Sequence, residues 1–205
     1  MADKLLVPCL YLQSGRAVTG FGQRNLFGNG DVAELAHFYS DNGADELLVF
    51  DFSSGDAEHE QAISRIKEIC AASEIPVMAA GNINRMEDVK KLIYAGCARV
   101  ALNFSKKSNV DLLEEMSKRF GQDKMFVSIS SPEEFTDNQS LIMSYAGGIL
   151  ALDTVQDTVA AASSMQVILH TDENSMAKIS GFLKHPGVAG LSGAFVSSLN
   201  RNLLE

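Results

Sequence analysis

Residues 40–51 read Ser-Asp-Asn-Gly-Ala-Asp-Glu-Leu-Leu-Val-Phe-Asp, in which a helical pattern reaches a glycine and an apolar run follows. Gly43 suits the left-handed position that comes directly after the last residue of a helix. The run Leu47–Phe50 is apolar at consecutive positions, which is typical of a strand buried on both faces in a parallel sheet. This stretch therefore predicts a helix that ends at a glycine and leads into a buried parallel strand.

The same pattern returns three more times along the chain. Helical patterns end at a glycine within residues 94–96, 145–147 and 184–187, and each is followed by another short apolar run. The repeats are roughly 40 to 53 residues apart, or about two strand–helix units each, so four repeats imply eight strands. The expected strands are Leu5–Leu12, Glu46–Phe52, Pro76–Ala80, Arg99–Asn103, Met125–Ile129, Gly148–Leu152, Gln166–His170 and Val188–Leu191.

The stretches between these strands carry helical patterns. The first begins with Asp31 at the helix cap and Glu34 three residues later, close to a capping box. Another, over residues 61–72, places isoleucine at every third position and so forms one apolar stripe. Residues 132–145 are polar and only weakly helical near 140–144. The expected helices are residues 31–40, 61–72, 86–95, 110–120, 157–164 and 175–184.

Eight alternating strand and helix units predict an α/β protein with a closed (βα)8 TIM barrel. An open doubly wound sheet is the competing interpretation. With 205 residues the chain is at the small end of such barrels, and no linker or change of composition divides it. We therefore expect one barrel domain over residues 1–205. The short final pattern at residues 200–205 suits the N-terminal part of a longer polypeptide.

Composition limits the classes of function. Seventeen basic and 26 acidic residues give a formal net charge of −9, which counts against nucleic-acid binding because that requires phosphate neutralisation by Lys and Arg. No apolar run is long enough to span a membrane, and the first residues carry no signal-peptide pattern. Cys9, Cys70 and Cys97 form neither a disulfide framework nor a zinc-ligand pattern. We expect a reduced, cytoplasmic protein with no metal and no cofactor.

Several blocks in the first 120 residues resemble the cyclase subunit of imidazole glycerol phosphate synthase, a barrel of histidine biosynthesis related to the ProFAR isomerase. The longest block is Val-Pro-Cys-Leu-Tyr-Leu-Gln-Ser-Gly-Arg-Ala-Val-Thr-Gly at residues 7–20, and others are residues 34–40, 43–51 and 99–103. The resemblance implies the same barrel fold and a substrate that carries two phosphates across the barrel mouth. It also implies a glutaminase partner docked at the opposite, N-terminal face.

Function in such a barrel resides at the carboxyl ends of the strands. The resemblance implies two catalytic aspartates there, which act as general acid and general base. This chain has Tyr11 at the first position and Ser128 or Ser130 at the second, and neither residue type supplies a carboxylate. The Tyr11 ring is expected to plug the mouth, with a catalytic hydroxyl as the alternative. Asp51 and Asp153 are candidates for a relocated acid–base pair, or else orient neighbouring side chains or cap the next helix.

The resemblance also implies two phosphate sites. The turns after the third and fourth strands are partly retained and offer backbone amides to an anion. After the sixth strand the family's Asp-Gly loop is missing, and after the seventh strand Asp172 and Glu173 would repel a phosphate. His170, which ends the seventh strand, is expected to be structural. The candidate phosphate-binding residues are Gly81, Asn82, Asn103, Ser105, Ser192 and Gly193.

Three hypotheses about function follow. We favour a divergent histidine-biosynthesis, cyclase-like barrel that lacks the catalytic acids. It would act as an accessory or phosphate-ligand-binding domain, fused to or associated with another enzyme of the pathway. The second hypothesis is a working lyase or isomerase on a phosphoribosyl imidazole precursor, and the third is a sensor of a phosphorylated small molecule. Glu46 and Arg99 resemble charged positions of the family's ammonia gate, but Leu5 replaces a basic residue, which counts against a glutaminase partner.

Overall fold

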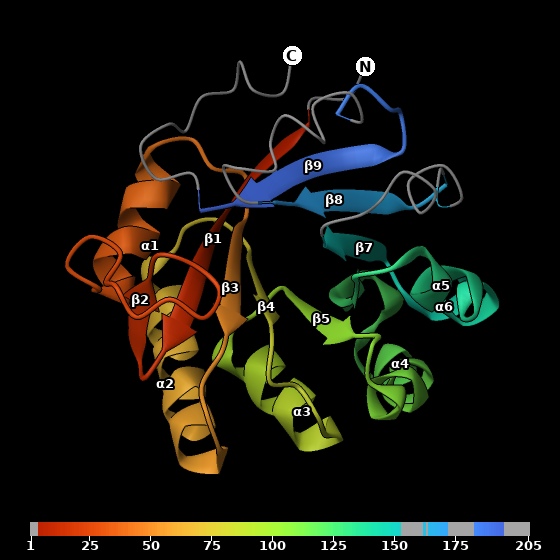
Figure 1. The fold of residues 1–205 in the computed structure, drawn as a ribbon, viewed down its shortest axis with the longest axis horizontal. Coiled ribbons are helices and arrows are strands. Elements are labelled where there is room, and N and C mark those ends of the chain that lie inside the picture. Colours follow the sequence, from red (N-terminus) through yellow and green to blue (C-terminus); the bar gives the residue numbers. More distant parts are fainter. Residues whose placement is uncertain (1–3, 153–161, 163, 172–182, 195–205) are drawn as a thin grey trace.

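The computed structural model describes residues 4–152, 162, 164–171 and 183–194. Within these residues eight parallel strands form a closed barrel with helices on its outside (Figure 1). The barrel closes because β1 pairs in parallel with both β3 and β9. The expected (βα)8 fold is therefore confirmed. The barrel strands are β1 (Leu5–Gln13), β3 (Leu47–Asp51), β4 (Val77–Ala80), β5 (Arg99–Asn103), β6 (Met125–Ile129), β7 (Gly148–Leu152), β8 (Gln166–His170) and β9 (Val188–Gly193).

One further strand, β2 (Arg16–Val18), was not expected from the sequence. It pairs antiparallel with the end of β1 through the two-residue turn Ser14-Gly15, whose φ angles are 48° and 70°. Positive φ at both central residues is the geometry of a type I′ hairpin. The hairpin turns the chain back, and the loop that follows it brings Phe21 against Phe52, just after the end of β3.

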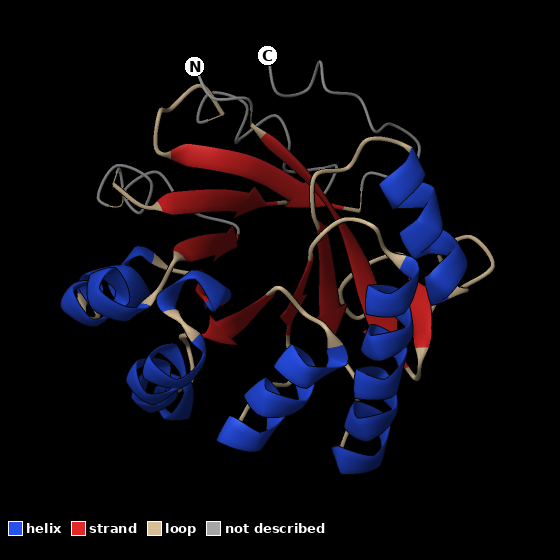
Figure 2. Cartoon of the chain, turned by 180° about the vertical axis from the view of Figure 1, so that it is seen from behind, coloured by secondary structure: helices blue, strands red, loops and turns tan. Residues whose placement is uncertain are grey.

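Six helices and one 3₁₀ turn are described, and Figure 2 shows the helices around the strands. The Asp31 carboxylate caps α1 by accepting from the backbone N–H groups of Ala33 and Glu34, while the Glu34 carboxylate accepts from Asn29. Residues 132–145, in which the sequence indicated only weak helicity near 140–144, contain two short helices. Pro132 occupies the first position of α5. The elements are α1 (Val32–Asp41), α2 (Asp56–Ala72), α3 (Met86–Ala95), α4 (Lys107–Phe120), η1 (Gln122–Lys124), α5 (Pro132–Thr136) and α6 (Gln139–Tyr145).

The expected helix over residues 175–184 falls almost wholly outside the described residues, as does most of the one over 157–164. Within the described part of the chain, no helix is long and apolar enough to cross a membrane.

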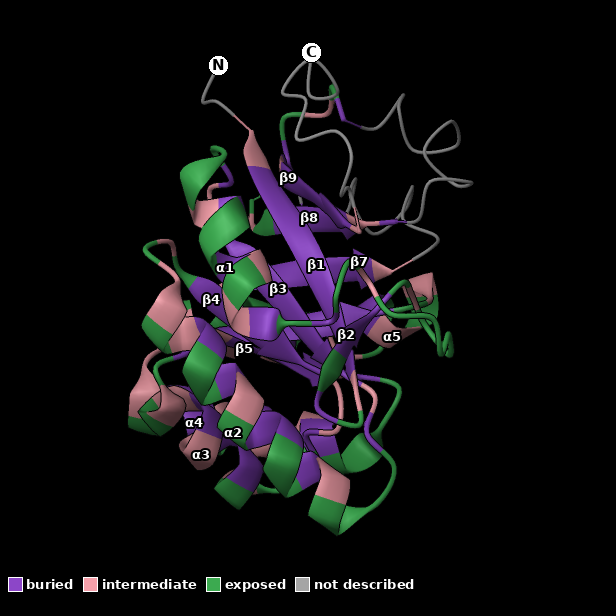
Figure 3. Ribbon diagram, turned by 90° about the vertical axis from the view of Figure 1, so that its left-hand side faces the viewer, coloured by how far each residue is buried: buried purple, intermediate pink, exposed green. Residues whose placement is uncertain are grey.

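The strands are buried on both faces, as Figure 3 shows. Alternate residues of β1 and of β3 to β8 point into the barrel and form one apolar cluster, which includes Cys9, Leu48 and Phe126. The intervening residues, such as Leu47 and Val49, form a larger cluster with the inward faces of the helices. Two buried faces explain why these strands are almost continuously apolar in sequence.

Candidate functional site

The parallel strands bring the carboxyl-terminal ends of β1, β3, β4, β5 and β6 to one rim of the barrel. Tyr11, Asp51, Asn103 and Ser130 lie at or next to these ends, whereas Asp153 lies outside the described residues. Among the described residues no group of three His, Cys, Asp or Glu side chains is arranged to hold a metal ion.

Aromatic rings fill the part of the mouth above β1 and β3. The Tyr11 ring is 6% exposed and stacks on Phe52, with 5.6 Å between ring centroids and 20° between ring planes. Phe50 stacks on Phe52 at 4.9 Å. Phe21 covers Phe52 from the loop after β2, with its centroid 3.9 Å away, and remains 70% exposed. Tyr11, at the end of β1, is thus a buried ring packed among phenylalanines at the mouth.

The Tyr11 hydroxyl is hydrogen-bonded to His170, with 2.9 Å between Oη and Nε2. The other ring nitrogen of His170 lies 3.1 Å from the Ser192 hydroxyl. This chain of polar groups links the neighbouring strands β8, β9 and β1 along one side of the mouth. Sequence reasoning named all three residues but did not pair them. Ser192 and Gly193 are buried at the end of β9, so the Ser192 hydroxyl serves the contact with His170.

Asp51 is buried and its carboxylate contacts helix α2. Its Oδ1 accepts from the backbone N–H of Ser53 at 2.8 Å and from the Ser53 hydroxyl at 2.5 Å. Its Oδ2 lies 2.7 Å from Nδ1 of His59, and Nε2 of His59 lies 3.5 Å from the buried Asp88. The hydrogen bond to Asp51 raises the pKa of His59, and attraction from both carboxylates adds to it despite desolvation. His59 thus lies between two buried carboxylates, and both favour its protonated form.

The turn after β4 is held against the turn after β3. Gly81 has a φ of +80°, and a Cβ there would lie 2.2 Å from the Asp51 carbonyl oxygen, so only glycine fits. Asn82 follows at φ 47°, and its Nδ2 donates to the Ser53 carbonyl at 2.6 Å. Asp88 receives the backbone N–H of Arg85 at 3.0 Å. The His59 network therefore supports the turn that carries Gly81 and Asn82 from both ends.

The turn after β5 leads into the exposed amino end of α4. Asn103 Oδ1 accepts the backbone N–H of Ser105 at 2.9 Å and its hydroxyl at 2.8 Å. Lys106 donates to Asn84 at 2.7 Å and so joins this turn to the one after β4. No side chain caps α4, and Ser105, Lys106 and Lys107 are exposed. Helix amides, a hydroxyl and two cations in one place form a setting that suits an anion.

Ser130 is tied to helix α5. Its backbone N–H and its hydroxyl both donate to the Glu134 carboxylate, at 2.8 Å and 2.9 Å. Ser128, two residues earlier, is buried within β6. These contacts with Glu134 are those of a helix-capping turn.

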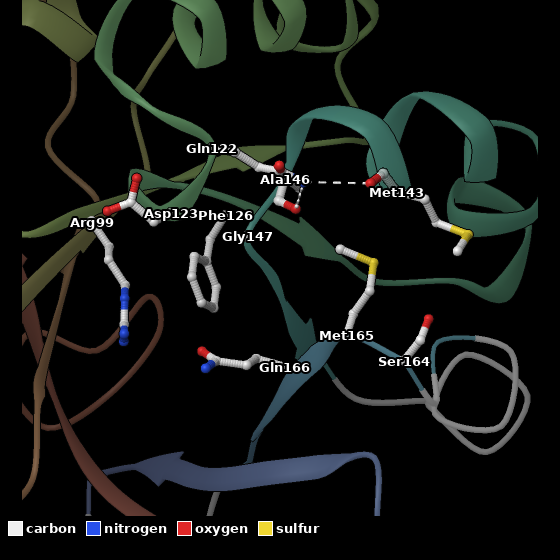
Figure 4. A pocket seen from close by; sticks show the side chains of 10 residues that line it. All are labelled: Arg99, Gln122, Asp123, Phe126, Met143, Ala146, Gly147, Ser164, Met165 and Gln166. Atoms are coloured by element: carbon white, nitrogen blue, oxygen red, sulfur yellow. Dashed lines mark hydrogen bonds between the residues drawn. The ribbon is translucent and has the colours of Figure 1, made fainter.

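A pocket of about 600 Å³ opens at the other, N-terminal end of the barrel, between the starts of β5 and β8 (Figure 4). Arg99 lines it and forms an ion pair with Glu46, which is 1% exposed. The Arg99 guanidinium also lies 5.2 Å over the Phe126 ring. Burial raises the pKa of Glu46 to about 7, although Arg99 pulls it down. Figure 4 shows Gln122 on the pocket wall, where it donates to the carbonyls of Met143 and Ala146.

Comparison with known proteins places this barrel in a family. The family described as "Histidine biosynthesis protein" matches residues 5–172. The chain belongs to this family. Its resemblance to the histidine-biosynthesis barrels, recognised above from residues 7–20 and later blocks, is confirmed.

Curated members of the histidine biosynthesis family are similar to this chain. An imidazole glycerol phosphate synthase subunit HisF from Azobacteroides pseudotrichonymphae is 34% identical over 149 residues, which are 73% of this chain and 59% of the relative. The HisF subunit of Campylobacter concisus is 30% identical over 163 residues, 80% of this chain and 63% of the relative. The HisF subunit of Lysinibacillus sphaericus is 30% identical over 186 residues, which are 89% of this chain and 73% of the relative. The chain spans about three fifths of the length of the first two relatives.

Proposed function

We propose that this histidine-biosynthesis barrel is a divergent, cyclase-like domain that binds a phosphorylated small molecule and does not catalyse cyclisation or isomerisation by itself. The proposed anion site, called here the retained half-site, consists of the turns at residues 81–85 and 103–107. The observation that carries the proposal is the packed Tyr11 ring, at a position where the resemblance implies a catalytic aspartate.

The loss of acid–base chemistry is the first part of the argument. A well-placed general acid or base contributes about 10²- to 10⁴-fold to a rate. Tyr11 is stacked among phenylalanines, and the Ser130 hydroxyl donates to Glu134. Asp51 is engaged by Ser53 and His59 behind the barrel wall. Each of these contacts supports a structural role for the residue concerned.

The retained half-site is the second part. Its two turns are joined by the bond from Lys106 to Asn84, and the Asn103–Ser105 contacts hold Ser105 at the amino end of α4. Lys106 and Lys107 add positive charge to the helix dipole. This arrangement supports binding of one phosphate group in a chain whose net charge is −9.

Isothermal titration calorimetry with imidazole glycerol phosphate tests the binding claim. We expect saturable binding, and Ser105→Asp should weaken it at least tenfold because the new carboxylate repels the phosphate. Ser140→Asp is the matched control, since Ser140 is an exposed serine on α6, and it should leave the affinity unchanged. Absence of saturable binding, or equal affinities for the two variants, would contradict the proposal.

A working lyase or isomerase is the second candidate, favoured by one contact. The Tyr11 hydroxyl and His170 lie 2.9 Å apart at the mouth, and a tyrosine–histidine pair can exchange a proton with a bound substrate. Under this alternative, Tyr11→Phe would abolish turnover of a phosphoribosyl imidazole precursor while leaving its binding intact. The assay uses ammonia rather than a glutaminase as nitrogen donor. Glu46 and Arg99 of the expected ammonia gate are paired, but Leu5 stands where the resemblance implies a basic residue.

A further inference from the structure

Two cysteines on the outer layer of the barrel lie side by side although they are 27 positions apart in sequence. Cys70 is near the carboxyl end of α2, and Cys97 lies between the end of α3 and the start of β5. Their sulfur atoms are 3.8 Å apart, and both are free thiols. Gly96, next to Cys97, brings the backbone close, since a Cβ added there would lie 3.1 Å from the Cys70 Cβ.

We propose that Cys70 and Cys97 form a reversible intramolecular disulfide that fastens α2 to the end of α3. The sulfur atoms must approach from thiol contact to a bond length of about 2.05 Å. Both residues stand at the end of a helix rather than in its middle. This pairing is specific, because the third cysteine, Cys9, is buried inside the barrel on the opposite side of β1 from the helices.

The two thiols have different environments, which assigns them different roles. The hydrogen bond from Cys97 lowers the pKa of Cys70, while that same contact, together with burial, raises the pKa of Cys97. Cys70 is partly exposed and Cys97 is 4% exposed. The thiolate is the nucleophile in disulfide exchange. Cys70 is therefore the residue that meets an external reagent, and Cys97 is the residue that resolves the intermediate.

The oxidant is a small-molecule disulfide of the glutathione class. The Cys70 thiolate attacks one sulfur of that disulfide, breaks its S–S bond and releases one thiolate, which leaves a mixed disulfide on Cys70. Cys97 then gives up its proton and attacks Cys70 Sγ, which forms the protein disulfide and expels the second small thiolate. Two protein thiols are oxidised and one external disulfide is reduced to two thiols. The proton that Cys70 loses on forming its thiolate goes to the first departing thiolate, and the Cys97 proton goes to the second.

The bond would fasten two helices that already share the buried His59 network. His59 lies on α2 and Asp88 on the first turn of α3, so α2 and α3 are linked at one end by that network and at the other by the two cysteines. The inference does not depend on the proposed function, because it concerns the outer layer and not the mouth.

Equilibration of the full chain in buffers of defined reduced-to-oxidised glutathione ratio tests the proposal. Samples are quenched with acid, alkylated under denaturing conditions and analysed by intact mass and peptide mapping. We expect a species lighter by two hydrogen atoms, with one alkylatable thiol, a Cys70–Cys97 peptide link and full reversal by dithiothreitol. Half of the protein should be oxidised at a reduced-to-oxidised glutathione ratio that is at least tenfold higher in native buffer than in denaturant.

Single substitutions separate this pairing from unspecific oxidation. Cys70→Ser and Cys97→Ser should each abolish the lighter species, while Cys9→Ala should retain it. Oxidised wild-type protein should melt about 5–10 °C higher than reduced protein. The peptide map of the wild type stands even if a variant fails to fold. A glutathione adduct alone, a link through Cys9, or three alkylatable thiols at every ratio would overturn the proposal.

Discussion

Replacement of His59 by glutamine is expected to destabilise the barrel strongly. The His59, Asp51 and Asp88 side chains are 8%, 2% and 1% exposed. Water therefore has little access to the two carboxylates and could not replace the contacts that His59 makes with them. Removal of one partner from a buried ion pair costs about 3–5 kcal/mol. Glutamine can still donate one hydrogen bond to Asp51, which places the expected loss near 3 kcal/mol. For a chain of this length that loss lowers Tm by about 6–12 °C.

The same substitution has a defined pH dependence. The pKa of His59 is raised in the folded protein above its ordinary value of 6.5. The stability that protonated His59 contributes is therefore fully present below pH 6.5 and is lost as pH rises through the folded pKa. Two cations also face this network: Arg85 lies 3.6 Å from Asp88, and Lys91 on α3 is attracted to the same carboxylate. The stability difference between wild type and His59→Gln should shrink between pH 6 and pH 9.

Urea unfolding followed by circular dichroism at these two pH values measures the difference. His37→Gln is the matched control, because His37 is exposed on α1, and it should change stability by less than about 0.5 kcal/mol. A His59→Gln protein as stable as wild type at pH 6, or a difference that grows toward pH 9, would refute the account of this network.

Gly81→Ala should lower the free energy of unfolding by more than about 3 kcal/mol, since its Cβ would lie 2.2 Å from the Asp51 carbonyl oxygen. Gly43→Ala, at a similar φ but with no atom near the new Cβ, should lower it by about 1–2 kcal/mol. Thermal melts compare the two variants. Burial raises the pKa of Glu46 to about 7 in the folded protein, so the wild type loses stability as pH rises from 4.5 through 7. Glu46→Gln has no such carboxyl group and should therefore gain about 1–3 kcal/mol of stability relative to wild type over this range. Urea unfolding at pH 5 and pH 8 measures this, and a relative loss would contradict it.

The fold could be predicted because its signals are local. Continuous apolar runs mark the strands, and glycines such as Gly96, with a φ of 112°, end helices before them. Strand β2 could not be predicted from its pattern, because three residues are too few to show the alternation of apolar and polar residues that marks a strand. The Ser14-Gly15 pair before it is a hairpin signal. The helices in residues 132–145 were underestimated because short helices depend on packing more than on pattern.

The site could be predicted only where its contacts are local. The Asn103–Ser105 turn follows from neighbouring residues, and the anion setting was expected there. The Tyr11–His170 contact spans 159 residues and arises only when the barrel closes. The direction of the Asp51 side chain was accessible in principle, because Asp51 follows the outward-facing Leu47 and Val49 at a period of two. Its partner His59 was missed because it lies across a turn, on the next helix.

Phosphorus NMR of the purified chain, mixed with the family's bisphosphorylated cyclase substrate and excess ammonium, tests the central claim most directly because it reads binding and turnover in one sample. The account predicts a phosphate signal that broadens in proportion to added protein and no new phosphorus signals over hours. Ser105→Asp should remove the broadening. Conversion of the substrate at a rate within about tenfold of an active relative would contradict the account, and so would signals that remain sharp at every protein concentration.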